Sequence, residues 1–163
     1  MLKQSLNNWI AAFVFLALTI FIGYTVEQSH FNLILYGSWF GAFLWIILGK
    51  RSTSEVIFFL GLAVVARLVL FPAFPLLSDD IYRFIWDGRL IINGQNPFDY
   101  LPTHWHNTNG SELGLNKELF DSLNSPEYFT IYPPICQAIF AISQWFAGSS
   151  IFGAMLVLSL IHI

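Results

Sequence analysis

Two adjacent carboxylates, Asp79 and Asp80, stand out in the stretch LSDDIYRFIWDGRL at residues 77–90. The stretch directly follows a long apolar run, in a chain of which only 10% of the residues are charged. Neighbouring carboxylates at a membrane surface can contain one group of high pKa, or a base that a nearby cation orients. Such a base could accept the proton of a hydroxyl that attacks an activated sugar. Carboxylates are also hard ligands, so a divalent cation is compatible with the pair, although two acids alone are a weak metal signal.

The same stretch also has the pattern of an ordinary capped helix. Ser78 is a suitable N-cap, and acids in the first turn interact favourably with the helix dipole. Helical spacing places Asp79, Arg83 and Asp87 on one face as a ladder of alternating charge. The pattern predicts a half-apolar helix that lies in the membrane interface and ends at an Asn-Gly turn. Spacing alone therefore favours a structural interpretation of the charges over a catalytic one.

Arg67 is the second unusual residue, because it lies inside an apolar run. A charge at the centre of a membrane helix costs about 2.5–3.5 kcal/mol on insertion scales. The side chain could extend to the outer headgroups or pair with another helix. Alternatively, its guanidinium could bind a lipid phosphate near the outer leaflet. Both interpretations stay open.

Two further motifs carry weaker signals. His104 and His106 in PTHWHN would point the same way in an extended chain, but no third ligand is near, so we predict no metal site. The motif TIYPPICQ places Pro133 and Pro134 at the start of an apolar run, where proline is a routine first helical residue. The alternative is a rigid entry that aims Tyr132 into a cavity above the membrane.

The composition indicates a membrane protein. The chain of 163 residues is 56% hydrophobic, and its mean hydropathy is +0.62, whereas soluble domains carry about 25% charged residues. The formal net charge of -3 is small and gives no reason to expect nucleic acid as a partner. The single Cys136 excludes a disulfide within the chain.

Long apolar runs predict an all-α integral membrane fold. Crossing the bilayer takes about 20 apolar residues as a helix. Within 1–77 we expect three spans at about 9–25, 31–49 and 56–77, followed by an extracytoplasmic loop at 78–130. The segment 131–163 would hold a fourth span at 131–147 and the start of a fifth, which gives four or five spans. Because only 13 residues remain from Ile151 onward, we expect an N-terminal piece of a longer protein.

Lysine and arginine positions predict the orientation. Lys3 precedes the first span, and Lys50 and Arg51 occupy the turn between the second and third spans. The other short turn contains neither residue type. Under the positive-inside rule the N-terminus is cytoplasmic and the 78–130 loop is extracytoplasmic.

Three segments together resemble a known family: SDDIYRFIWDGRLIINGQNPFDYLP (78–102), LNSPEYFTIYPP (123–134) and the apolar run with Arg67. The ordered motifs SDD-x-YR-x-x-WDGR, G-x-NP-[FY] and T-x-YPP resemble the N-terminal part of bacterial polytopic mannosyltransferases. These are glycosyltransferases of the GT-C architecture, similar to glycosyltransferase family 87. The resemblance covers roughly residues 60 to 140.

The resemblance implies a multi-pass enzyme of the bacterial plasma (inner) membrane. It would transfer a sugar, expected to be mannose, from a polyprenyl-phosphate donor to a glycan or lipid acceptor on the extracytoplasmic face. An acid of the first large outer loop is the general base in the family, and Asp79 and Asp80 occupy that place. The family's usual order favours Asp79, but Arg83 could equally bind Asp79 and leave Asp80 free. The other residues expected to contact substrate are Arg67, Tyr82, Arg83, Trp86, Asp87, Arg89, Asn96, Tyr132 and Pro133.

The implied reaction is a direct displacement that inverts the anomeric carbon, with Arg67 or Arg83 stabilising the leaving phosphate. The chain lacks a G-x-G-x-x-G motif and a P-loop, which fits a lipid-linked donor better than a nucleotide sugar. Membrane lipids are expected partners, and no cofactor is assigned beyond the compatible divalent cation. Family members have about twice as many spans, so a chain of this length is expected to be inactive alone.

Two other classes of function remain. A transporter or flippase of lipid-linked glycans would use Arg67 and the acidic ladder to bind substrate in transit. It needs ionisable residues along several spans, whereas here the charges gather in one loop. A non-catalytic membrane scaffold predicts that the aspartate pair tolerates substitution.

Overall fold

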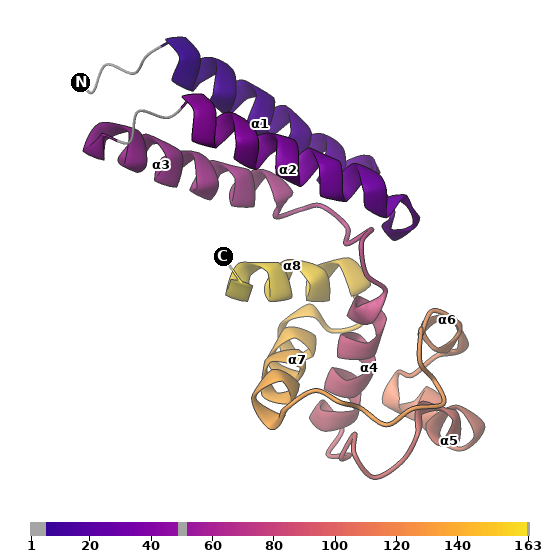
Figure 1. The fold of residues 1–163 in the computed structure, drawn as a ribbon. Coiled ribbons are helices and arrows are strands. Elements are labelled where there is room, and N and C mark those ends of the chain that lie inside the picture. Colours follow the sequence, from indigo (N-terminus) through magenta and orange to yellow (C-terminus); the bar gives the residue numbers. More distant parts are fainter. Residues whose placement is uncertain (1–5, 49–51, 163) are drawn as a thin grey trace. The chain divides into compact units, whose positions relative to one another are not determined.

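The computed structural model describes residues 6–48 and 52–162, and all regular secondary structure in these ranges is helical. The fold class expected from the sequence is thus confirmed at the level of an all-α protein. Contacts divide the chain between Leu77 and Ser78 into an N-terminal unit and a C-terminal unit (Figure 1). The two units are described separately below.

The N-terminal unit consists of α1 (Leu6–Thr25), a short 3-10 turn η1 (Gln28–His30), α2 (Phe31–Leu48) and α3 (Thr53–Leu70). Helix α1 packs against both α2 and α3. Near one end of α1, Asn8 donates a hydrogen bond from Nδ2 to Oε1 of the buried Glu55 on α3, at 2.9 Å. Near the other end, the Tyr24 hydroxyl donates to the Val69 carbonyl at 2.7 Å. These two bonds fix the register of α1 on α3.

Two helices of the described residues, α1 and α3, are long and apolar enough to cross a membrane, judged by length and composition. The third span was predicted at 56–77, but the helix runs from Thr53 to Leu70. It starts earlier because Ser52 and Glu55 form a capping box. It ends earlier because Pro72 has no backbone N–H with which to continue the hydrogen-bond ladder.

The C-terminal unit is built around α4 (Asp80–Ile92). Helix α4 packs along α7 (Pro134–Ala147), and α7 packs in turn against α8 (Ile151–His162). The short helices α5 (Pro102–Asn107), η2 (Gly110–Leu113) and α6 (Lys117–Asp121) belong to the chain between α4 and α7, and Figure 1 shows α5 and α6 on the side of α4 away from α7. The segment that the sequence assigned to a fourth and fifth span thus packs with the loop segment in one unit.

Helix α4 is the buried centre of this unit and not a solvated helix, whereas its expected location in the membrane interface stays a prediction. Ile85 and Trp86 have no exposed surface, and Leu90 is 1% exposed. Gly88 explains how α7 approaches so closely, because a Cβ at this position would lie 2.5 Å from the Phe140 carbonyl oxygen of α7. The glycine of the WDGR motif therefore serves helix packing.

Helix α7 has an inverted distribution of polarity. Its buried side chains include Gln137, Ser143 and Gln144, whereas Trp145 and Phe146 are 74% and 68% exposed. Its 14 residues correspond to about 21 Å of helix, short of the roughly 30 Å hydrocarbon core. The helix begins at Pro134, three residues later than the predicted span, because Pro133 is its N-cap. The buried face of α7 thus carries several polar side chains, and its exposed face carries large apolar ones.

Candidate functional site

The two aspartates at the start of α4 have different environments. The helix begins at Asp80, and Asp79 rather than the predicted Ser78 is the N-cap. The Ser78 hydroxyl accepts a hydrogen bond from the Asp80 backbone N–H at 3.2 Å. The Asp79 side chain is exposed, and it makes no hydrogen bond to any residue that the structure describes.

The Asp80 carboxylate is held in place from two directions. Asn124 donates from Nδ2 to Oδ1 of Asp80 at 3.0 Å, and the Tyr132 hydroxyl also hydrogen-bonds the carboxylate. The Tyr132 ring is fixed by edge-to-face contacts with Phe84 and Phe140, at centroid distances of 5.0 and 5.4 Å. Burial of Tyr132 and the charge and hydrogen bond of Asp80 raise the pKa of the phenol from 10.0 to about 12. Tyr132 therefore keeps its proton at ordinary pH and is the hydrogen-bond donor to Asp80.

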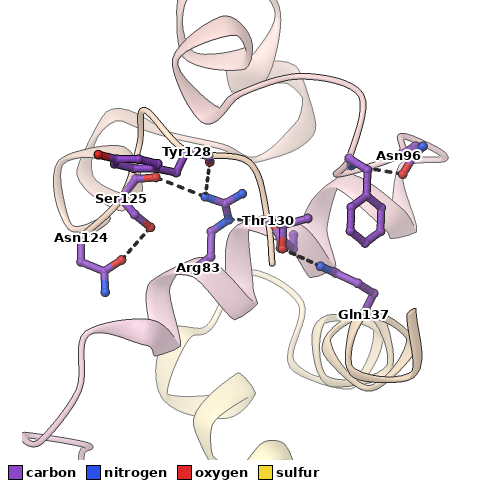
Figure 2. Close-up of polar contacts among 9 residues, drawn as sticks. Arg83, Asn96, Asn124, Ser125, Tyr128, Thr130 and Gln137 are labelled. Carbon is purple, nitrogen blue, oxygen red and sulfur yellow. Dashed lines mark hydrogen bonds and ion pairs between the residues drawn. The ribbon is translucent and has the colours of Figure 1, made fainter. Parts of the chain in front are cut away.

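Arg83 binds Asp87 rather than Asp79. Its Nε lies 2.9 Å from Oδ1 of Asp87, one helical turn further along α4, and both side chains are almost fully buried. Its Nη1 donates to the carbonyls of Ser125 and Tyr128, at 3.3 and 3.0 Å, as Figure 2 shows. The predicted charge ladder thus has one ion pair, and Arg83 leaves both aspartates at the helix start free of a direct salt bridge.

The second oxygen of Asp87 is also occupied. Gln137 of α7 donates from Nε2 to Oδ2 of Asp87 at 2.9 Å. The same Nε2 lies 2.8 Å from the Thr130 hydroxyl, a contact drawn in Figure 2. Asp87 has no exposed surface. It therefore lies behind the surface that a substrate can reach, and its role in this structure is to join α4, α7 and the segment between them.

Trp86 and Arg89 were also predicted to contact substrate, but both side chains are buried. Trp86 is fully buried beside Phe120 of α6. Arg89 is 7% exposed and donates to Gln144 Oε1 and to the carbonyls of Gly114 and Ser149. Burial lowers the pKa of its guanidinium. These contacts tie the C-terminal half of α4 to two loops, and nine residues of helix place Arg89 about 14 Å along the axis from Asp80.

Asn96 does not lie at the rim of the Asp80 site. It follows the end of α4, whose 13 residues span about 20 Å. There it forms a turn in which Nδ2 donates to Asp99 at 2.7 Å and Oδ1 accepts from the Phe98 backbone N–H at 3.2 Å, the turn labelled in Figure 2.

The other predicted residues occupy three kinds of place. Tyr82 is half-buried and packs against the core of the C-terminal unit. Pro133 is exposed at the N-cap of α7. Arg67 is exposed in the last turn of α3, in the N-terminal unit, where Nη1 donates to the Ala63 carbonyl at 3.4 Å. Within the predicted set the structure brings Tyr132 to Asp80 and Arg83 to Asp87.

The two loop histidines lie on the short helix α5 and not on an extended segment. The His104 ring stacks on Tyr100 at 4.2 Å, and the His106 ring stacks on Phe120 at 4.0 Å. Residues two apart on a helix point in different directions, so the rings do not converge. Within the described ranges, no group of three or more His, Cys, Asp or Glu side chains is placed to hold a metal ion.

Sequence reasoning missed the partners that come from the segment 123–137. Asn124 holds Asp80, and Thr130 and Gln137 complete the contacts of Asp87. Gln137 carried a usable signal, since a lone amide in an apolar run needs a hydrogen-bond partner. Asn124 carried none, because asparagine after a short polar helix is ordinary.

No family model, curated protein or solved structure matches this chain. The resemblance to GT-C mannosyltransferases therefore depends on the motifs themselves, and the function that it implies is argued below as a proposal.

Proposed function

We propose that this chain belongs to a membrane glycosyltransferase that moves a sugar, expected to be mannose, from a polyprenyl-phosphate donor to a glycan or lipid acceptor. The observation that carries the proposal is the environment of Asp80. The motifs SDD and TIYPP supply Asp80 and Tyr132, which contact each other. Asp87 of the WDGR motif pairs with Arg83, and Arg83 binds the carbonyl of Ser125, next to the Asn124 that holds Asp80.

Asp80 is the general base in this proposal. A carboxylate has about four acceptor positions, so the bonds from Asn124 and Tyr132 leave lone pairs for an incoming hydroxyl. Holding the carboxylate by two donors fixes its orientation before substrate arrives, which general-base catalysis requires. Asp79 is less suitable because its side chain is exposed and has no hydrogen bond to a described residue that would orient it.

The reaction is a single displacement. Asp80 takes the proton of the acceptor hydroxyl as its oxygen forms a bond to the anomeric carbon of the donor sugar. The bond between that carbon and the phosphate oxygen breaks, and polyprenyl phosphate leaves with the electron pair. The configuration at the anomeric carbon is inverted. A cation near the leaving phosphate would stabilise its charge, and a role for Arg67 there stays a prediction, because Arg67 belongs to the other unit.

Several features support a location in the bacterial plasma membrane. Helices α1 and α3 have the length and composition of spans, and α7 carries exposed Trp145 and Phe146 on its outer face. From Tyr128 to Ile163 the sequence contains no Asp, Glu, Lys or Arg. The positive-inside rule then places the loop at 78–130 on the extracytoplasmic side. A cysteine introduced at Asn109 would test this orientation by its reaction with an impermeant thiol reagent in intact cells.

The decisive experiment compares the two aspartates in membranes that contain the complete protein and a labelled polyprenyl-phosphate mannose. Asp80→Asn is expected to lower the transfer rate by about 10²–10⁴-fold, the usual contribution of a general base. Asp79→Asn is the matched control, since it removes the neighbouring charge and leaves the Asn124 and Tyr132 contacts intact. Equal activity of the wild type and Asp80→Asn would overturn the assignment, and no transfer by the wild type with any polyprenyl-phosphate sugar would overturn the function.

A further inference from the structure

An open pocket lies in the C-terminal unit, at the start of α5. This cavity has a volume of about 410 Å³, within the roughly 300–1,000 Å³ typical of small-molecule sites. Its lining includes Asp99, Tyr100, Thr103, His104, Asn107 and Phe129. We name it the Tyr100 pocket. None of these residues takes part in the contacts around Asp80.

Aromatic surface forms part of the lining of the Tyr100 pocket. Tyr100 is 49% exposed and Phe129 is 53% exposed. The Tyr100 ring is held rigidly, because it stacks on His104 at 4.2 Å and contacts the edge of Trp105 at 5.7 Å. A fixed aromatic ring offers apolar contact area to a ligand at little cost in side-chain entropy.

Polar groups of the pocket remain available for a ligand. Among the described residues, the side chains of Thr103 and Asn107 have no hydrogen-bond partner, and one oxygen of Asp99 is held by Asn96 at 2.7 Å, leaving the other. Together they offer hydroxyl, amide and carboxylate groups, which can donate and accept hydrogen bonds. The lining contains no Lys or Arg. A phosphate or another anion would therefore meet the Asp99 carboxylate without a lysine or arginine to bind it, so the chemistry favours a neutral ligand.

A neutral ligand with many hydroxyls and small apolar faces is a sugar. From this combination we propose that the Tyr100 pocket binds a neutral oligosaccharide. In the proposed transferase this oligosaccharide is the acceptor glycan. The acceptor role rests on the proposed function, whereas the binding of an oligosaccharide does not. Asn96 then has a place in the site as a positioning residue, since it orients Asp99 by its 2.7 Å hydrogen bond.

The segment 124–132 connects the pocket with the proposed base. Phe129 lines the pocket, the preceding carbonyl of Tyr128 accepts a hydrogen bond from Arg83, and Tyr132 hydrogen-bonds Asp80. Three residues of chain span at most about 10 Å. Phe129 and Tyr132 are therefore at most about 10 Å apart along the chain, and an oligosaccharide that extends from Phe129 toward Tyr132 approaches Asp80.

The test measures binding of mannotriose to the intact chain in lipid nanodiscs by saturation-transfer NMR and calorimetry. A dissociation constant of roughly 1 mM is expected, and Phe129→Ala should weaken binding about tenfold. Tyr100→Phe keeps the ring and should bind like the wild type, whereas Tyr100→Ala should not. Phe98→Ala, an exposed aromatic outside the pocket lining, is the matched control, and circular dichroism verifies that each variant is folded.

Outcomes separate the pocket from the transferase proposal. Asp80→Asn should lower the transfer rate by about 10²–10⁴-fold but leave mannotriose binding unchanged. Binding without transfer in the wild type would support the pocket alone. No binding of mannotriose or maltotriose by the wild type, or equal binding by Phe129→Ala and Tyr100→Ala, would overturn the pocket. Transfer with an unchanged KM for the acceptor in both variants would overturn its role as the acceptor site.

Discussion

Arg83 and Asp87 form a buried ion pair one helical turn apart on α4, with Nε and Oδ1 separated by 2.9 Å. The pair has further hydrogen bonds, because Arg83 also binds two carbonyls and Asp87 also accepts from Gln137. It joins the helix that begins with the proposed base to the segment that supplies Asn124 and Tyr132. Arg83 and Asp87 thus hold the segment that orients the proposed base and do not themselves face a substrate.

Removal of one member of this pair should be costly. Asp87→Ala leaves the buried Arg83 guanidinium without its countercharge and is expected to destabilise the protein by about 3–5 kcal/mol. Thermal unfolding in detergent measures the effect. The double variant Arg83→Met with Asp87→Leu should recover part of the loss, because no uncompensated charge stays buried. An Asp87→Ala variant as stable as the wild type would contradict the buried pair.

Gly88 should not tolerate a side chain. Gly88→Ala brings a Cβ to 2.5 Å from the Phe140 carbonyl oxygen, and overpacking of this kind costs about 1–3 kcal/mol. Gly61→Ala on α3 is the matched control, since nothing lies within 4 Å of a Cβ there and alanine favours a helix by up to about 1 kcal/mol. The two variants should therefore shift the unfolding temperature in opposite directions. Stabilisation by Gly88→Ala would show that α4 and α7 are further apart.

Tyr132 should ionise at unusually high pH. Its pKa of about 12 predicts a late component in the phenolate absorbance titration, and Tyr132→Phe should lack this component. Because the folded-state pKa exceeds the unfolded value of 10.0, the associated stability is fully present below pH 10 and is lost as pH rises toward 12. Asp80→Asn should lower the pKa of Tyr132 toward 10.0 without reaching it, because burial is the larger cause of the raised pKa. A titration identical in wild type and Tyr132→Phe would contradict the contact.

Arg89 should hold two loops against the end of α4. Arg89→Lys cannot reproduce the planar fork that reaches Gln144, Gly114 and Ser149. Each buried acceptor left without a donor costs about 1–3 kcal/mol. Hydrogen exchange should therefore accelerate at 110–116 and 147–151 while the start of α4 keeps its protection. Exchange that changes uniformly over the C-terminal unit would argue against this local role.

The outer face of α7 should contact lipid. In a Cys136→Ala background, a nitroxide at Ile142→Cys should collide with dissolved oxygen more than with a water-soluble nickel chelate, and Glu118→Cys should show the reverse. Ile142 is 45% exposed and lies on the apolar side of the helix, whereas Glu118 is an exposed acid on α6. Equal accessibility of both labels to the nickel chelate would place this face in water.

The sequence by itself determined the all-helical class and most of the helix positions, because apolar runs, prolines and the Asn-Gly turn act locally. It also located the proposed site, since the SDD and TIYPP motifs are both short and close to helix starts. The spacing of Arg83 and Asp87 predicted their approach, because residues four apart on a helix are neighbours whatever the surroundings.

Only the tertiary structure decided which groups face one another. Helical spacing allowed Arg83 to bind Asp79 or Asp87 equally, and the carbonyls of residues 125 and 128 turn it toward Asp87. The segment that orients Asp80 lies more than 40 residues away in the chain. No local sequence pattern predicts a contact over that separation. Burial of α4 was also invisible in the sequence, because its charges looked like a solvated face. They are satisfied by Gln137, Gln144 and loop carbonyls, and such partners are found only when the chain has folded.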